Sequence, residues 1–307
     1  MRRLGSAGPD LSAVGFGAWE AGGGAEWGAS PPEEQVLAAI AAVLDTGISW
    51  IDTAEVYGKG RSEELVGRAI AGRRDEVLLA TKVAPAPYGT GFRADEVRRA
   101  CEASLRRLGI ERIDLYQLHW IDEDVPVEEP WTAMAALVDA GLVRWIGVSN
   151  FDRGQIERCE AIRHVDSLQQ EFSMLERGDA DLIRWCGDQG TGVVTYGPLA
   201  YGLLTGAIDA STTFHPDDHR ARPDSLFGPA RRPAGLAVVE AMRPVAARLG
   251  CSLAQLAVAW NVHQPGVTSA IVGSRDARHV ADNAAAGAIA LDDATLAELD
   301  RAAALSG

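Results

Sequence analysis

The stretch Ile51-Asp52-Thr53-Ala54-Glu55-Val56-Tyr57-Gly58 ends an apolar β-strand on a carboxylate and places a phenol five residues after that carboxylate. Two later apolar strands also run into one titratable group each, Lys82 after residues 78–81 and His119 after residues 113–118. A phenol with a neighbouring ammonium suits the donation of a proton to a developing alkoxide. Each group alone also fits a structural role, but four groups at the ends of successive strands favour one site. The four candidate catalytic residues are Asp52, Tyr57, Lys82 and His119.

Apolar runs typical of buried parallel strands alternate with helical stripes along the whole chain. The predicted strands cover residues 13–17, 49–53, 77–83, 114–119, 143–148, 167–170, 193–196 and 269–272. The first two helices are expected after N-caps at Ser30, with Pro31 as the first helical residue, and Ser62. Eight such βα units in about 300 residues are typical of a closed (β/α)8 barrel. We therefore expect one α/β domain over residues 1–307, a TIM barrel with a short N-terminal segment and a C-terminal helix. An open doubly wound sheet is the alternative.

The barrel gives the candidate residues a common location. Active sites of this fold lie at the carboxyl ends of the strands, where all four candidates are expected. Residues 205–235 are rich in proline and arginine and are predicted to form a long rim loop. The arginines of this loop either close over a bound anion or are simply solvated, and both interpretations stay open.

Composition restricts the class of partner. The formal net charge of −14 argues against non-specific binding to nucleic acid and to anionic membranes. The four cysteines lack metal-ligand spacing, which favours reduced thiols in a cytoplasmic protein. No signal peptide and no membrane-spanning run is expected. His215 and His219 have metal-ligand spacing, but Pro216 disrupts the helix that this spacing assumes, so no metal is expected.

Several further motifs carry a resemblance to a known family. They comprise residues 15–19, 45–58, 58–67, 81–82, 115–119, 147–151, 169–173, 196–199 and 271–275, followed by Asp282-Asn283. In this order and at these spacings the chain resembles the aldo-keto reductase superfamily, and bacterial members in particular, over nearly its whole length.

The resemblance implies a catalytic role for each of the four candidates. A nicotinamide cofactor, NADPH, supplies hydride to the carbonyl carbon of a small aldehyde or ketone, and Tyr57 donates a proton to the carbonyl oxygen. Lys82 is expected to lower the pKa of Tyr57, and Asp52 to keep Lys82 charged. His119 is expected to orient the substrate carbonyl by a hydrogen bond.

The resemblance also implies cofactor contacts. No GxGxxG motif follows the first strand, so the dinucleotide fold with two mononucleotide halves is not expected. Ser149, Asn150 and Gln169 are expected to hold the carboxamide, and Tyr196 to stack on the nicotinamide ring. Arg275 offers a fork for a 2′-phosphate, which favours NADPH over NADH. The remaining expected contacts are Gly197, Leu199, Gly273, Ser274, His279, Asp282 and Asn283, with His279 standing where the family often has Gln or Arg.

Substrate specificity is expected to reside in aromatic rim residues. The candidate pocket residues are Trp19, Trp27, Tyr88 and Trp120, each of which could instead pack a loop. We expect an open site that accepts several aldehydes or ketones, and the sequence specifies no oligomeric state. An NADPH-binding regulatory subunit with little turnover, similar to potassium-channel β subunits, is one alternative function. A metal-dependent hydrolase on the same fold is another.

Overall fold

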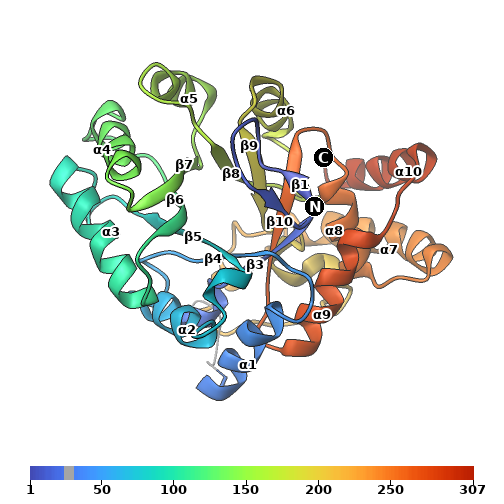
Figure 1. Cartoon of the computed structure of the whole chain (residues 1–307). Coiled ribbons are helices and arrows are strands. Elements are labelled where there is room, and N and C mark those ends of the chain that lie inside the picture. The colour runs from blue at the N-terminus through green and yellow to red at the C-terminus, as the bar shows by residue number, and fades with distance from the viewer. Residues whose placement is uncertain (24–30) are drawn as a thin grey trace.

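Eight parallel strands close into a barrel in the part of the chain that the structure, a computed structural model, describes: residues 1–23 and 31–307 (Figure 1). The strands are β3 (Val14–Gly17), β4 (Trp50–Asp52), β5 (Leu78–Val83), β6 (Ile113–Leu118), β7 (Val143–Ser149), β8 (Ser167–Glu171), β9 (Gly192–Tyr196) and β10 (Val267–Gly273). Each strand pairs with the next in sequence, and β10 pairs with β3. This closure confirms the predicted (β/α)8 TIM barrel, and the alternative of an open sheet is wrong.

Helices surround the barrel, as Figure 1 shows. They are α1 (Glu33–Val43), α2 (Arg61–Ala69), α3 (Ala94–Leu108), α4 (Glu128–Asp139), α5 (Arg153–Glu160), α6 (Ala180–Gln189), α7 (Arg232–Leu249), α8 (Leu253–Val262), α9 (Ala277–Ala285) and α10 (Asp293–Ala303). The last of these is the predicted C-terminal helix. Among the described residues no single helix is long and apolar enough to cross a membrane. The helices α7 and α8 have that length and composition only together, bent by 92° at their break.

A short N-terminal hairpin was not predicted. It pairs β1 (Arg2–Arg3) with β2 (Asp10–Leu11), and strands of two residues are too short to leave a periodic signal. Leu4 and Leu11, which are 1% and 2% exposed, pack with Trp50 and Leu115 inside the barrel. The hairpin therefore extends the barrel core at the end opposite to the carboxyl ends of the strands.

The first two helices begin at other residues than predicted. Helix α1 begins at Glu33 after Pro32, rather than at Pro31, and Ser30 lies outside the described residues. Helix α2 begins at Arg61, and its N-cap is Gly60 with φ of 93°. Ser62 is not the cap, because its buried hydroxyl donates instead to the carbonyl of Ala18, 2.7 Å away. This bond ties α2 to the segment that follows β3.

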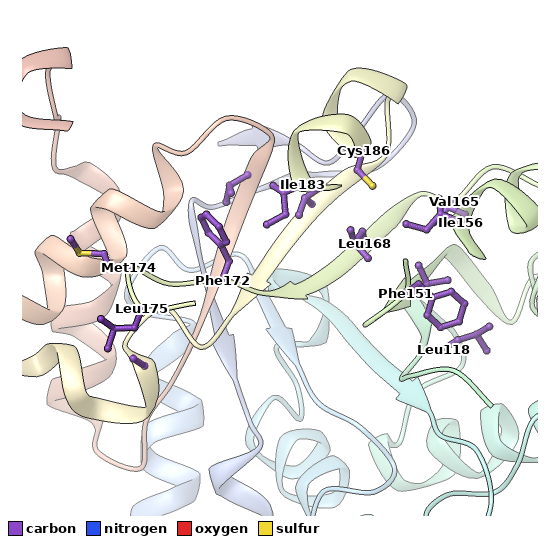
Figure 2. Close-up of a cluster of buried hydrophobic side chains, with 14 of the residues drawn as sticks. Leu118, Phe151, Ile156, Val165, Leu168, Phe172, Met174, Leu175, Ile183 and Cys186 are labelled. Carbon is purple, nitrogen blue, oxygen red and sulfur yellow. The ribbon is translucent and has the colours of Figure 1, made fainter. Parts of the chain in front are cut away.

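The largest apolar cluster fills the space between the barrel and its outer helices. Figure 2 shows part of it around β6, β7 and β8, where Leu118, Phe151 and Leu168 are fully or almost fully buried. Phe172 stacks on Trp260 of α8 with the ring centroids 5.6 Å apart. Such packing fixes the carboxyl ends of these strands and therefore the side chains that project from them.

The predicted rim loop has structure of its own. Between the 3-10 helix η4 (Ala200–Thr205) and α7 lies a second 3-10 helix, η5 (His219–Ala221), and the last residues of the predicted 205–235 loop belong to α7. Leu226 and Phe227 of this segment are buried, and Phe214 packs edge-on against Phe227 at 4.9 Å. The segment is therefore anchored to the barrel by its own apolar residues.

Candidate active site

Lys82 is the centre of a buried polar cluster at the carboxyl ends of β4 and β5. Its Nζ donates to Asp52 Oδ1 at 2.5 Å, to the carbonyl of Thr53 at 3.0 Å and to the hydroxyl of Tyr57 at 3.1 Å. The Lys82 side chain is fully buried and that of Asp52 is 4% exposed. An ammonium has three N–H donors, so all of them are engaged within the cluster.

Close backbone packing positions Tyr57. The 3-10 helix η1 (Glu20–Gly22) lies against residues 57 and 58, and a Cβ on Gly22 would be only 2.7 Å from the carbonyl carbon of Tyr57. Gly58 faces Gly22 in the same way and has φ of 58°. Trp19 stacks on the Tyr57 ring with centroids 6.0 Å apart. The backbone of Tyr57 is thus held against η1, and its phenol contacts Trp19 and Lys82.

Burial controls the protonation of this cluster. It raises the pKa of Tyr57 well above its usual range, and the charge of Asp52 raises this pKa further. Burial lowers the pKa of Lys82, an effect that Asp52 opposes. The net shift of the Tyr57 pKa is therefore upward, because the phenol is buried, and the expected lowering by Lys82 itself stays a prediction. The phenol is therefore protonated at neutral pH.

His119 follows β6 and faces the same cluster. Its ring lies edge-on to Tyr57 at 5.5 Å and against Trp120 at 4.3 Å, measured between ring centroids. Burial lowers the pKa of His119 well below its usual range, and the positive charge of Lys82 lowers it further. The imidazole is thus neutral at pH 7. Its buried Nδ1 has no hydrogen-bond partner in the part of the chain that the structure describes.

The residues predicted to hold the nicotinamide lie beside the catalytic candidates and are bonded to them. Gln169 Nε2 donates to Asp52 Oδ2 at 2.9 Å. Asn150, which has φ of 60°, donates through Nδ2 to the carbonyl of His119 and to Ser149 Oγ, each at 3.1 Å. The hydroxyl of Tyr196 donates to Asn150 Oδ1 at 2.8 Å. These side-chain bonds form two sets, one at Asp52 and one at Asn150, and the backbone N–H of Asn150 links them by donating to the carbonyl of Gln169 at 3.0 Å.

Most of the other residues predicted to bind the cofactor lie where β10 meets α9. Gly273 ends the strand, Ser274 is buried, and Arg275 Nε lies 3.8 Å from Glu20 Oε2. His279 is exposed and Asn283 is buried, both on α9. Asp282 accepts a hydrogen bond from Gln255 of α8 at 2.8 Å, which joins these two helices. Gly197 and Leu199 lie in the turn between β9 and η4.

An aromatic rim borders the cluster. Of the predicted pocket residues, Trp19 contacts Tyr57, and Tyr88, which is 77% exposed, packs edge-on to Trp120 at 6.2 Å. Trp27 lies outside the described residues.

Sequence reasoning missed two aromatic residues and two carboxylates at this rim. Tyr201 and His219 pack together at 5.1 Å, and His219 lies 5.8 Å from Trp19. Tyr201 belongs to η4 and His219 to η5, and 3-10 helices this short have no periodicity that indicates which side chains face inward. Glu20 and Glu55 also went unnoticed, although Glu55 lies within the opening motif only two residues before Tyr57.

Among the described residues, no three His, Cys, Asp or Glu side chains are placed to hold a metal ion.

The sequence pattern of the Aldo/keto reductase family matches residues 13–304. The chain belongs to the aldo/keto reductase family. The relatives of this aldo/keto reductase include YhdN of Bacillus subtilis (strain 168), named as an aldo-keto reductase. The two are 40% identical over 277 residues, which is 87% of this chain and 82% of YhdN.

Solved structures resemble this aldo/keto reductase over nearly its full length. The glycerol dehydrogenase AKR11B4 from Gluconobacter oxydans has a TM-score of 0.88 and 32% sequence identity, covering 100% of this chain and 95% of that one. An aldo/keto reductase from Klebsiella pneumoniae, solved in complex with NADP and acetate, has a TM-score of 0.74 and 34% identity, covering 95% and 91%.

Proposed function

We propose that this protein reduces the carbonyl group of small aldehydes or ketones to alcohols with NADPH, and that Tyr57 donates the proton. The observation that carries the proposal is the buried chain from Asp52 through Lys82 to the Tyr57 hydroxyl, with links of 2.5 and 3.1 Å. Membership of the aldo/keto reductase family supports NADP(H) as the cofactor.

The chemistry of the surrounding groups fits this cofactor. Ser149, Asn150 and Gln169 offer the hydroxyl and amide groups that a carboxamide needs as donors and acceptors. Gly273 ends β10, and Arg275 follows two residues later with a guanidinium that suits a phosphate. NADPH, when bound, supplies the hydride that reduces the carbonyl carbon.

Proton donation follows from the direction of one hydrogen bond. Because Lys82 donates to the Tyr57 oxygen, the phenolic hydrogen remains available to a substrate oxygen. The raised pKa keeps that hydrogen on Tyr57 at neutral pH. When the proton moves to the forming alkoxide, the ammonium already lies 3.1 Å from the developing phenolate and stabilises it. Solvent then returns a proton to Tyr57.

His119 acts without a charge of its own. A neutral imidazole beside Tyr57 can donate a hydrogen bond to the carbonyl oxygen and align it with the phenol. Burial disfavours the protonated imidazole, and repulsion from Lys82 disfavours it further, so the pKa of His119 is lowered. We propose that Tyr196 stacks on the nicotinamide ring, and that His279, Asp282, Asn283, Gly197, Leu199 and Ser274 complete the cofactor site.

The proposal is tested with a panel of aldehydes and ketones, by following the loss of NADPH absorbance. We expect turnover of several compounds, because Tyr88 and Trp120 border an exposed rim rather than a closed cavity. Tight NADPH binding with no turnover of any compound would instead favour the regulatory subunit.

A further inference from the structure

We propose that Glu20 competes with a phosphate group of the cofactor for the cations at the end of β10. This inference rests on the proposed function, because it assumes that NADPH binds at Gly273 and Arg275. It assigns to Glu20 the role of a residue that weakens cofactor binding and so speeds release.

The Glu20 carboxylate lies beside Arg275 and Gly273. Glu20 Oε2 lies 3.8 Å from Arg275 Nε. A Cβ on Gly273 would lie 3.4 Å from Glu20 Oε1, so the carboxylate rests directly against this glycine. The Glu20 carboxylate therefore lies within the segment that is expected to receive an anionic group.

Positively charged side chains, among them Arg275 and Arg220, act on the Glu20 carboxylate. Burial raises the pKa of Glu20, while Arg275, Arg220 and His279 each act in the opposite direction. Arg220 lies in η5, before α7, whereas Arg275 lies between β10 and α9 and His279 lies in α9. Arg220 also forms a forked contact with Asp218 at 2.7 and 3.0 Å. A group of cations that faces one partly buried carboxylate would also attract a phosphate.

The backbone that carries Glu20 cannot easily move away. Glu20 begins η1, whose Gly22 is pressed against the backbone of residues 57 and 58. The displacement of the carboxylate on cofactor binding must therefore come from rotation of the Glu20 side chain.

The existing ion pair is weak enough to be displaced. A separation of 3.8 Å is at the outer limit for an ion pair, and the side chains of Arg275 and Glu20 are 27% and 25% exposed. At that separation Arg275 Nε and Glu20 Oε2 are too far apart for a hydrogen bond. A phosphate offers Arg275 more acceptor oxygens and a larger charge, so it wins the competition but with a reduced net affinity.

The test compares Glu20→Gln, which keeps the shape and removes the charge, with Glu240→Gln as a matched control. Glu240 is exposed on α7 and pairs with Arg243 at 2.9 Å. Dissociation constants for NADPH and NADH are measured by intrinsic tryptophan fluorescence, since the chain has eight tryptophans, at low and high salt. Glu20→Ala serves as a second variant, and thermal unfolding confirms that all variants fold.

For Glu20→Gln and Glu20→Ala we expect the Kd for NADPH to fall about tenfold, equivalent to about 1.4 kcal/mol. The gain should shrink at high salt, and Glu240→Gln should bind like the unaltered protein. A gain for NADPH alone assigns the competition to the 2′-phosphate, and an equal gain for NADH assigns it to the pyrophosphate.

Unchanged or weaker NADPH binding in both Glu20 variants would overturn the inference, because Glu20 would then merely hold Arg275 in place. If the unaltered protein binds neither NADPH nor NADH, the proposed function itself fails, and the inference with it.

Discussion

Lys82 directs its three N–H donors to Asp52, to the carbonyl of Thr53 and to the hydroxyl of Tyr57. Because Asp52 also accepts from Gln169, the charge of this carboxylate is shared between the proton-donating group and the expected nicotinamide site. Removal of one charged member leaves the other buried and unpaired, which is more costly than removal of both.

A double-mutant cycle tests this coupling. We expect Lys82→Met to abolish most turnover and to lower the free energy of unfolding by about 3–5 kcal/mol, since Asp52 becomes an unpaired buried charge. Adding Asp52→Asn should restore most of that stability but none of the turnover. Denaturant unfolding and NADPH oxidation measure the two effects. Additive losses of stability in the double variant would show that the two charges are not coupled.

The direction of the pKa shifts predicts how activity depends on pH. Reduction needs protonated Tyr57 and neutral His119. The pKa of Tyr57 is raised and that of His119 is lowered, so protonated Tyr57 and neutral His119 coexist over a wide pH range. We expect kcat for carbonyl reduction to be constant from about pH 6.5 to about pH 10, the ordinary pKa values of His and Tyr. Alcohol oxidation, which needs the phenolate, should rise throughout this range.

Steady-state profiles of both directions provide the measurement. A fall in the reduction kcat centred between about pH 7 and about pH 9 would contradict the raised pKa of Tyr57.

Among the elements, the connection between β5 and α3 depends on a single carboxylate. Glu55 accepts hydrogen bonds from the backbone N–H of Ala84 and of Thr90, each at 3.0 Å, and from the Thr90 hydroxyl at 2.6 Å. Between these anchors lies Tyr88, which packs on Trp120 at the rim. Glu55 therefore links the strand that carries Asp52 to the loop that borders the substrate.

We expect Glu55→Ala to loosen this loop, because two backbone N–H groups lose their acceptor, at about 1–3 kcal/mol each. The KM for bulky aromatic aldehydes should rise several-fold, while kcat and the KM for a small aliphatic aldehyde change little. Kinetics with one aldehyde of each kind measure the difference. An equal rise in KM for both aldehydes would mean that Tyr88 does not contact the substrate.

For the molecule as a whole, the barrel could be predicted from the sequence because its strands coincide with clear apolar runs. The N-terminal hairpin and the inward face of the segment before α7 could not be predicted, since short or irregular segments carry no periodic signal. The positions of Asp52, Tyr57, Lys82 and His119 followed from strand ends alone. The direction of the Tyr57 pKa shift could not be predicted in this way, because it depends on burial, which only the folded chain establishes. The role of Glu20 could not be predicted for a similar reason, because its partner Arg275 lies 255 positions later in the chain and only folding brings them together.

Tyr57→Phe tests whether the Tyr57 hydroxyl donates the proton. This change removes the hydroxyl that accepts from Lys82 but keeps the ring that stacks on Trp19. We predict a loss of about 10²–10⁴ in kcat, as expected for removal of a general acid, with the Kd for NADPH nearly unchanged. Turnover close to that of the unaltered protein, or loss of NADPH binding, would contradict this role of Tyr57.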